Sequence, residues 1–306
     1  MSELTAIRSR RVPATDGAAT RATLVGCAAL ALWSSLALLT VHARGVPSFE
    51  LEALSFGVAF LAGLAGLAVL ALRGPTALRQ LRQPLVPWLT AFLGIFMYHA
   101  LYFYALSAAP AAQASLISYL WPLLIVLLAA GSGDGLRARH LGGALLGLMG
   151  TGLVMLGPGA RSMQFGAATG YAAALGSAVV WAGYSVLNRR FGSTPSTVLV
   201  GVCGAVSLAG AACHLAFEPT VRPDTEQLLA IVALGLGPTG LAFFAWDHAT
   251  KHGRLGVLGA LSYLAPLAST LLLVATGRVE ASGLLLLAAI LVIGGAVLAT
   301  SRQRNE

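Results

Sequence analysis

The sequence predicts an all-α polytopic membrane protein with ten transmembrane helices, arranged as two inverted five-helix repeats. The chain is 57% hydrophobic and only 10% charged, whereas a soluble domain carries about 25% charged residues. Apolar stretches of about 20 residues, each long enough to cross a bilayer, recur along its whole length. A hexapeptide is also repeated, as Ser-Tyr-Leu-Trp-Pro-Leu at 118–123 and as Ser-Tyr-Leu-Ala-Pro-Leu at 262–267.

The apolar stretches follow one another closely from residue 23 to residue 300. Charged residues mark most of the gaps, and the third and fourth spans are joined only by Ala109 and Pro110. The spans are expected near residues 23–41, 51–72, 87–108, 111–131, 140–157, 168–188, 197–217, 228–249, 255–276 and 282–300.

The basic residues predict how these spans are oriented. If the N-terminus is cytoplasmic, 15 of the 19 Lys and Arg residues lie in cytoplasmic segments and four lie outside. Cytoplasmic loops carry such an excess of basic residues. We therefore expect a multi-pass protein of a bacterial inner (plasma) membrane with both termini cytoplasmic, and residues 1–22 form a polar cytoplasmic tail.

Two echoes at nearly the same offset indicate an internal duplication of roughly 145 residues. The two hexapeptides lie 144 residues apart, and Trp33 and Trp181, each in the first span of its half, lie 148 residues apart. The predicted repeats are residues 23–158 and 165–301. Because each repeat holds an odd number of spans, the second enters the bilayer from the opposite side, so the halves are inverted.

Composition also argues against several other functions. The net charge of +8 comes from basic residues that form no cluster with interleaved aromatics, so no nucleic-acid partner is expected. Cys27, Cys203 and Cys213 lie inside apolar runs without metal-ligand spacing, and the six histidines form no metal-ligand pattern with acids or cysteines. We expect no cofactor, no metal and no catalytic residue; the predicted partners are the lipid bilayer and a small molecule.

Aromatic residues gather in the third and fourth spans. Tyr98 and Tyr102 share one helix face, His99 lies beside that face, and Tyr119 and Trp121 follow in the next span. An aromatic belt at the membrane surface and core packing are the alternative interpretations, but Tyr98 and Tyr102 are too deep in their span for a belt. These side chains are predicted to line a substrate cavity.

The first spans of the two halves supply further aromatic candidates. Trp33 and Trp181 occupy equivalent places, and Tyr184 extends one side of the sixth span. These rings are predicted either to complete the walls of the cavity or to pack as core indoles. Aromatic walls with few charges suit a flat, mostly apolar solute.

Pro122 and Pro266 lie near the middle of their spans, at matching positions of the two hexapeptides. A proline inside a helix removes one backbone hydrogen bond and kinks the helix. Because the two prolines match between the repeats, they are predicted to be hinges.

Asp247 is interpreted as the single carboxylate inside a span. An ionisable residue within a membrane is a functional candidate by default, so Asp247 is a candidate coupling residue. However, His248 and Lys251 lie within four residues of it near the cytoplasmic end, and an interfacial ion pair is the competing interpretation.

Ten spans, a five-plus-five duplication, short loops and a proline in the fourth span of each half resemble the drug/metabolite transporter superfamily, in particular its ten-helix EamA-type branch. The run from Tyr98 to Tyr104 followed by Ser-Tyr-Leu-Trp-Pro is similar to exporters of aromatic amino acids of the YddG type. Four-helix multidrug members of the superfamily carry a Glu in their first span, where this chain has Trp33, Ser34 and Ser35 and no acid, so their proton exchange is not implied.

The resemblance implies an inner-membrane exporter of small amphipathic metabolites, above all aromatic or other neutral amino acids, that works by alternating access around a midplane cavity. A broad-specificity drug or cation exporter is the alternative within transport and would need a carboxylate at the cavity centre. A membrane-embedded enzyme is the alternative of another class, and it would need a nucleophile, base or metal cluster within a span.

Overall fold

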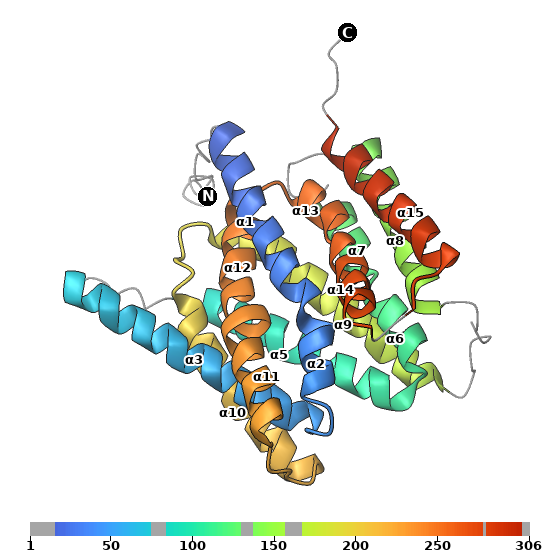
Figure 1. The fold of residues 1–306 in the computed structure, drawn as a ribbon. Coiled ribbons are helices and arrows are strands. Elements are labelled where there is room, and N and C mark those ends of the chain that lie inside the picture. Colours follow the sequence, from blue (N-terminus) through green and yellow to red (C-terminus); the bar gives the residue numbers. More distant parts are fainter. Residues whose placement is uncertain (1–15, 75–83, 130–136, 157–166, 278–279, 302–306) are drawn as a thin grey trace.

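The computed structural model describes residues 16–74, 84–129, 137–156, 167–277 and 280–301, and these residues form helices and no strands (Figure 1). The helices of the first half are α1 (Asp16–Ser34), α2 (Leu36–His42), α3 (Ser48–Arg73), α5 (Leu85–Ala108), α6 (Ala111–Ser118), α7 (Trp121–Ala129) and α8 (Ala138–Leu156). Those of the second half are α9 (Ala168–Leu187), η3 (Asn188–Phe191), α10 (Val198–Phe217), α11 (Thr225–Leu236), η4 (Gly237–Leu241), α12 (Ala242–His252), α13 (Leu255–Leu261), α14 (Leu264–Ala275) and α15 (Gly283–Thr300).

The predicted all-α membrane fold is confirmed. Within the described residues, eight helical segments are long and apolar enough to cross a membrane, and Gln113–Ala129 is a shorter apolar helix. α8 takes the place of the predicted fifth span, so the helices agree with ten spans. Of the predicted tail at 1–22, residues 1–15 lie outside the described residues, and α1 already begins at Asp16.

Both copies of the repeated hexapeptide interrupt a helix. α6 ends at Ser118 and α7 begins at Trp121, while α13 ends at Leu261 and α14 begins at Leu264. Each proline therefore lies in the first turn of the second segment, where a backbone N–H has no intrahelical partner and its loss costs little. At each site where the sequence predicts a kink, the structure thus has a two-residue turn between two helical segments of one span.

A π-helical turn, η4, interrupts the span formed by α11 and α12. Pro238 lacks an N–H, and the hydroxyl of Thr239 donates to the carbonyl of Leu234 at 2.9 Å. A Cβ added to Gly240 would lie 2.2 Å from the carbonyl oxygen of Gly235, so only glycine fits there. π-Helical turns occur frequently at functional sites.

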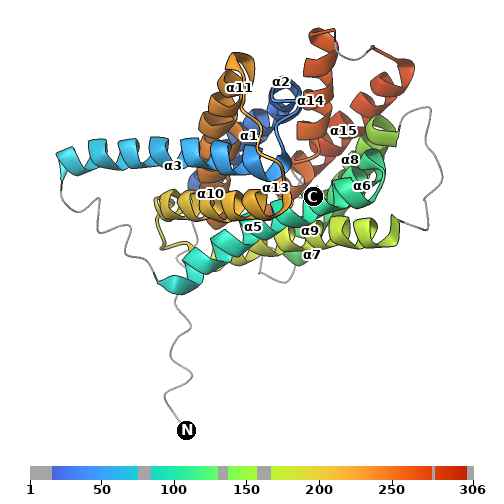
Figure 2. The same cartoon turned by 90° about the horizontal axis from the view of Figure 1, so that it is seen from below.

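The helices of the first half pack in pairs with those of the second half (Figures 1 and 2). The main pairs are α1 with α12, α3 with α10, α5 with α9, α7 with α13, and α8 with α15. Exchanging each span with its counterpart in the other half returns the same set of pairs. α8 and α15 pack closely, because a Cβ on Gly143 would lie only 2.5 Å from the carbonyl oxygen of Gly295.

Candidate functional site

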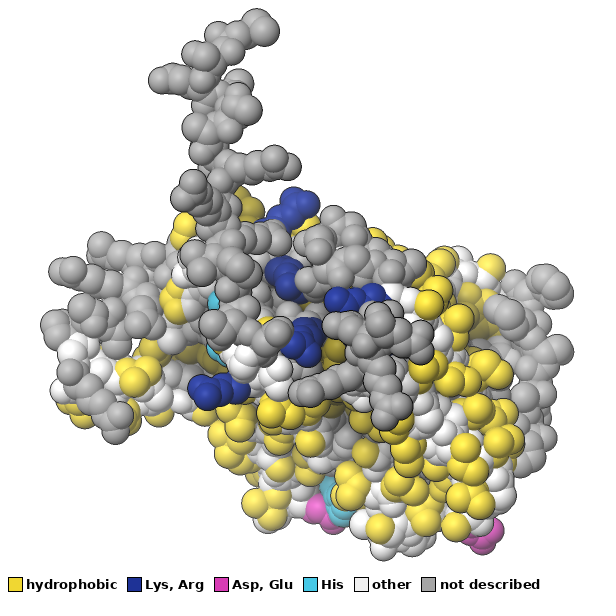
Figure 3. Space-filling model, turned by 90° about the horizontal axis from the view of Figure 1, so that it is seen from above, with side chains coloured by type: hydrophobic (Ala, Val, Ile, Leu, Met, Phe, Trp, Pro, Cys, Tyr) yellow, Lys and Arg dark blue, Asp and Glu magenta, His cyan; other side chains and the backbone are white. Residues whose placement is uncertain are grey.

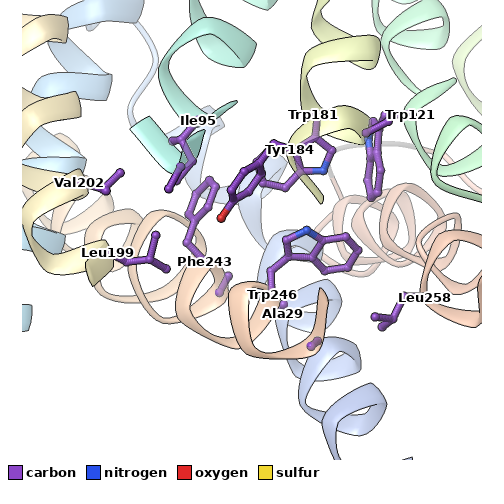
Figure 4. Close-up of a cluster of buried hydrophobic side chains, with 14 of the residues drawn as sticks. Ala29, Ile95, Trp121, Trp181, Tyr184, Leu199, Val202, Phe243, Trp246 and Leu258 are labelled. Atoms are coloured by element: carbon purple, nitrogen blue, oxygen red, sulfur yellow. The ribbon is translucent and has the colours of Figure 1, made fainter. Parts of the chain in front are cut away.

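Seven aromatic side chains meet in the centre of the bundle, and we call them the aromatic cluster. They come from α1, α5, α7, α9 and α12, so both halves of the chain contribute. Figure 4 shows the side chains from α7, α9 and α12 converging on one another. The members are Trp33, Tyr98, Trp121, Trp181, Tyr184, Phe243 and Trp246.

Trp181 on α9 is the hub of the aromatic cluster. Its ring centroid lies between 5.2 and 6.3 Å from the centroids of all six other members. The geometries range from nearly parallel with Trp246 to edge-on with Trp121. Such separations lie within the range in which aromatic pairs attract each other, so Trp181 connects the two halves of the bundle.

Hydrogen bonds fix the orientation of two indole rings in the aromatic cluster. Nε1 of Trp33 donates to the carbonyl of Pro238 in η4 at 3.0 Å. Nε1 of Trp246 donates to the hydroxyl of Ser185 on α9 at 3.0 Å. The first bond joins the two halves of the chain, and the second joins the sixth span to the eighth. A shift of η4 or α9 therefore moves an indole ring of the aromatic cluster.

α5 extends the aromatic surface beyond the cluster. Tyr98 stacks on Tyr102 with centroids 6.0 Å apart and planes 5° apart. The imidazole of His99 contacts Phe56 of α3 and Phe243 of α12 at centroid distances of 5.5 and 6.2 Å. Tyr98, His99 and Tyr102 therefore lie in one region at the edge of the aromatic cluster, as their spacing along the helix predicts.

A row of hydroxyl and amide groups, the polar row, extends from Tyr102 between α5, α6 and α9. The phenol of Tyr102 hydrogen-bonds the hydroxyl of Ser115 at 2.9 Å, and the hydroxyls of Ser118 and Ser177 bond at 2.8 Å. The hydroxyl of Tyr171 donates to the amide oxygen of Gln113. This row can offer hydrogen bonds to the polar end of a solute whose ring sits among the aromatic side chains.

Five of the eight predicted binding residues belong to the aromatic cluster, and His99 and Tyr102 border it. Tyr119 lies partly buried at the interruption between α6 and α7, and among the described residues it has no ring contact with the cluster. Phe243 and Trp246 of α12 were not among the predicted binding residues. They belong to the run Phe243-Phe244-Ala245-Trp246 in the second half of the eighth span, whose pattern does not show which rings face the centre.

Asp247 is a member of a saturated polar network. Its Oδ2 atom lies 2.7 Å from Nζ of Lys251 and accepts from the hydroxyl of Ser196 at 2.5 Å, and its Oδ1 atom accepts from Nδ2 of Asn188 at 2.9 Å. Nζ of Lys251 also donates to the carbonyl of Thr194 at 3.0 Å. Asp247 and Lys251 have side chains that are 1% and 2% exposed, so the ion pair is buried in the protein and ties residues 188–196 to α12.

The interpretation of Asp247 as the single carboxylate inside a span is wrong. Glu50 and Glu52 lie in the first two turns of α3, which is itself a candidate span, and both are buried. Oε2 of Glu50 accepts from the backbone N–H of Val221 at 3.1 Å. Neither carboxyl oxygen of Glu52 has a hydrogen-bond partner, and Oε1 lies 3.7 Å from Nδ1 of His99. Glu52 falls within the predicted span 51–72 but was not among the predicted site residues.

Comparisons with known proteins identify relatives of this chain. The model of the EamA-like transporter family matches the chain twice, over residues 20–156 and 168–301. The aromatic amino acid exporter YddG of Ancylobacter novellus is 48% identical over 93% of this chain and 98% of its own length. The exporter of the same name from Escherichia coli (strain K12) is 26% identical over 91% of this chain and 96% of its own. A solved crystal structure matches with a TM-score of 0.87 at 46% identity, covering 92% of this chain and 96% of the other.

Proposed function

Because the chain belongs to the EamA-like transporter family, we propose that it exports aromatic amino acids across a bacterial inner membrane. The chain is a multi-pass membrane protein, and membership of a transporter family means that it is not an enzyme. The proposed mechanism is alternating access around a central site. The predicted alternative of a membrane-embedded enzyme is thereby set aside.

The observation that carries this proposal is the aromatic cluster, to which both halves of the chain contribute. We propose that the substrate ring enters between Trp33, Trp121 and Trp181 and replaces some of their mutual contacts. Each ring pair contributes about 0.5–1.5 kcal/mol beyond burial of area. An aromatic substrate can recover these contacts, whereas an aliphatic amino acid cannot, which gives a preference for flat side chains.

We propose that the polar row of α5, α6 and α9 receives the carboxylate group of the substrate. Hydroxyls such as those of Tyr102, Ser115 and Ser118 donate and accept hydrogen bonds. A substrate site in a membrane must satisfy every polar group that it buries. The arrangement of rings beside hydroxyls fits a solute with one apolar and one polar end.

The proposed orientation has both termini in the cytoplasm, with the repeats 23–158 and 165–301 inverted. Figure 3 views the bundle from the side on which both α1 begins and α15 ends, and Lys and Arg side chains gather on that face. An excess of basic residues marks the cytoplasmic side. The interruptions before Pro122 and Pro266 then act as the hinges of the two halves.

The test is transport by the purified protein in proteoliposomes, with a panel of amino acids and lipophilic cations. We expect counterflow of tryptophan and phenylalanine, and little of alanine or of the cations. A preference for the cations would favour the alternative of a broad drug or cation exporter.

Two variants test the aromatic site directly. Trp121→Ala and Tyr102→Ala are each expected to weaken tryptophan transport about two- to tenfold, which corresponds to the loss of one ring contact. Tyr104→Ala is the matched control, because Tyr104 lies on the same helix as Tyr102 but is 51% exposed. Loss of folded protein in the first two variants, measured by size-exclusion chromatography, would instead indicate that these rings only pack the core.

A further inference from the structure

Glu52 is a buried carboxyl group whose charge nothing in its surroundings neutralises. The residue is 3% exposed, and both carboxyl oxygens lack a hydrogen-bond partner. His99 is the one basic side chain within ion-pair distance in the described part of the chain, at 3.7 Å from Nδ1 to Oε1. This Nδ1 atom lies 2.8 Å from the carbonyl oxygen of Ile95, which can only accept a hydrogen bond. The Nδ1 hydrogen of His99 is therefore donated to Ile95 and not to Glu52.

An ionised carboxylate in such a place is strongly unfavourable. The other titratable groups around Glu52 and His99 do not change this balance. Glu50 belongs to α3 itself, Tyr98 and Tyr102 lie on α5, and α10 with its following turn brings Cys213, His214 and Glu218. No Lys or Arg is among them, and the two neighbouring glutamates add negative charge. In this arrangement Glu52 is therefore a neutral carboxylic acid that holds a proton.

One side chain separates this acid from the aromatic cluster. The His99 imidazole lies against Glu52 on one side, and its centroid lies 5.2 Å from that of Tyr98 on the other. Phe56, one turn after Glu52 on α3, contacts both His99 and Phe243. A substrate that separates these rings brings its polar end within reach of the Glu52 carboxyl.

Glu50, two residues before Glu52, belongs to a group of polar side chains at the end of the bundle where α3 begins and α10 ends. Oε2 of Glu50 lies 3.9 Å from Nε2 of His214, and Nδ1 of His214 lies 3.1 Å from Glu218. Nε2 of His214 also bonds the hydroxyl of Thr220 at 3.0 Å. In the proposed orientation this end faces outward, so protons reach the Glu52 region from outside.

We propose that Glu52 is a proton-exchange site at which the ammonium group of an amino-acid substrate replaces a proton. When the substrate binds from the cytoplasm, the O–H bond of the carboxyl breaks, the proton leaves to water on the cytoplasmic side, and the carboxylate pairs with the ammonium group. After the substrate has left outward, a proton from outside returns to Glu52 by way of the Glu50–His214 groups. Substrate and proton then occupy Glu52 alternately, which couples export to proton entry. This inference rests on the proposed function, because it assumes an amino-acid substrate in the aromatic cluster.

The main measurement is proton release on substrate binding by the full chain in detergent. Tryptophan is added in weakly buffered solution with a pH indicator, and bound tryptophan is measured by equilibrium dialysis. The wild type is expected to release close to one proton for each tryptophan bound, and lower pH weakens its binding, as reciprocal linkage requires. Glu52→Gln is expected to bind tryptophan without proton release and without this pH dependence. Equal proton release by E52Q and wild type would overturn the proposal.

Glu226→Gln is the control, because Glu226 is a carboxylate of α11 that pairs with His42 at 2.6 Å and lies outside the proposed proton route. E226Q is expected to release the same proton as wild type. If E52Q does not fold, Glu52→Asp carries the test, since it withdraws the carboxyl by one methylene. E52D is expected to release the proton but to bind tryptophan more weakly, and unchanged affinity would overturn the proposal.

The ammonium group is tested by competition. Indole-3-propionate keeps the ring and carboxylate of tryptophan and lacks the amine, so wild type should favour tryptophan over it and E52Q should lose most of that preference. An unchanged preference in E52Q would refute ammonium recognition. Tryptophan counterflow without a pH gradient tests the transport function separately: counterflow with no proton release rejects this inference alone, whereas absence of counterflow rejects the function.

Discussion

Breaking the buried pair of Asp247 and Lys251 should destabilise the protein much more than it impairs transport. At 2.7 Å and an effective dielectric constant of about 20, the gross attraction of the two charges is about 6 kcal/mol. Much of this offsets the cost of removing both charges from water, and loss of one partner from a buried pair typically costs about 3–5 kcal/mol. We expect Asp247→Asn and Lys251→Met each to lower the free energy of unfolding by about 3–5 kcal/mol.

The double variant D247N/K251M separates the pair from its surroundings. With both charges removed, no unpaired charge stays buried, so its loss of stability should be less than the sum of the single losses by at least about 2 kcal/mol. Unfolding by SDS in mixed micelles gives the four free energies of the cycle. If the stability loss of the double variant equals the sum of the two single losses, the two charges do not stabilise each other and the expected coupling is refuted.

Transport by the same variants decides whether Asp247 has a coupling role. Its two oxygens already accept from Lys251, Ser196 and Asn188, so we expect D247N that has folded to keep pH-driven flux within a few-fold of wild type. Flux is measured in proteoliposomes and normalised to folded protein. Abolished gradient-driven flux with intact counterflow would assign proton coupling to Asp247 rather than to a structural tie.

Two further predictions concern topology and hinges. With the native cysteines removed, a cysteine at Thr225 should react with an impermeant thiol reagent in intact cells while one at Ser2 should not, and the reverse pattern would overturn the proposed orientation. Pro122→Ala and Pro266→Ala should each let the helix continue through its interruption, so that tryptophan still binds but its flux falls. The accessibility of a cysteine at Ser118 should shift toward opposite membrane faces in the two variants. Unchanged flux and accessibility would mean that the prolines only pack.

Much of the fold follows from the sequence because the bilayer restricts what a chain can do. Each apolar run of about 20 residues is expected to form a helix, because a helix satisfies its backbone hydrogen bonds within the segment in lipid. The repeated hexapeptide also located the interruptions, because proline and its neighbours act locally. The sequence analysis placed Tyr98 and Tyr102 together for the same reason, since four residues make one helical turn.

Contacts between distant segments were harder to predict. Phe243 and Trp246 join the aromatic cluster because α12 packs against α1, and nothing in their local sequence distinguishes a ring that faces the centre from one that faces lipid. Glu52 was overlooked because it stands near the end of its span, where an acid would ordinarily reach water. Only the packing of α10 and α5 against α3 buries it beside His99.

The two hexapeptides differ at a single position, where Trp121 in one stands for Ala265 in the other. Trp121 contacts Trp181 and Trp246, whereas Ala265 brings no ring to its equivalent place. After a gene duplication, selection can thus keep the residues of the helix turn in both copies while the residue before the proline changes in only one of them, where it joins the proposed substrate site. If the proposed site and hinges are correct, substrate preference can change by one substitution while the moving parts stay the same.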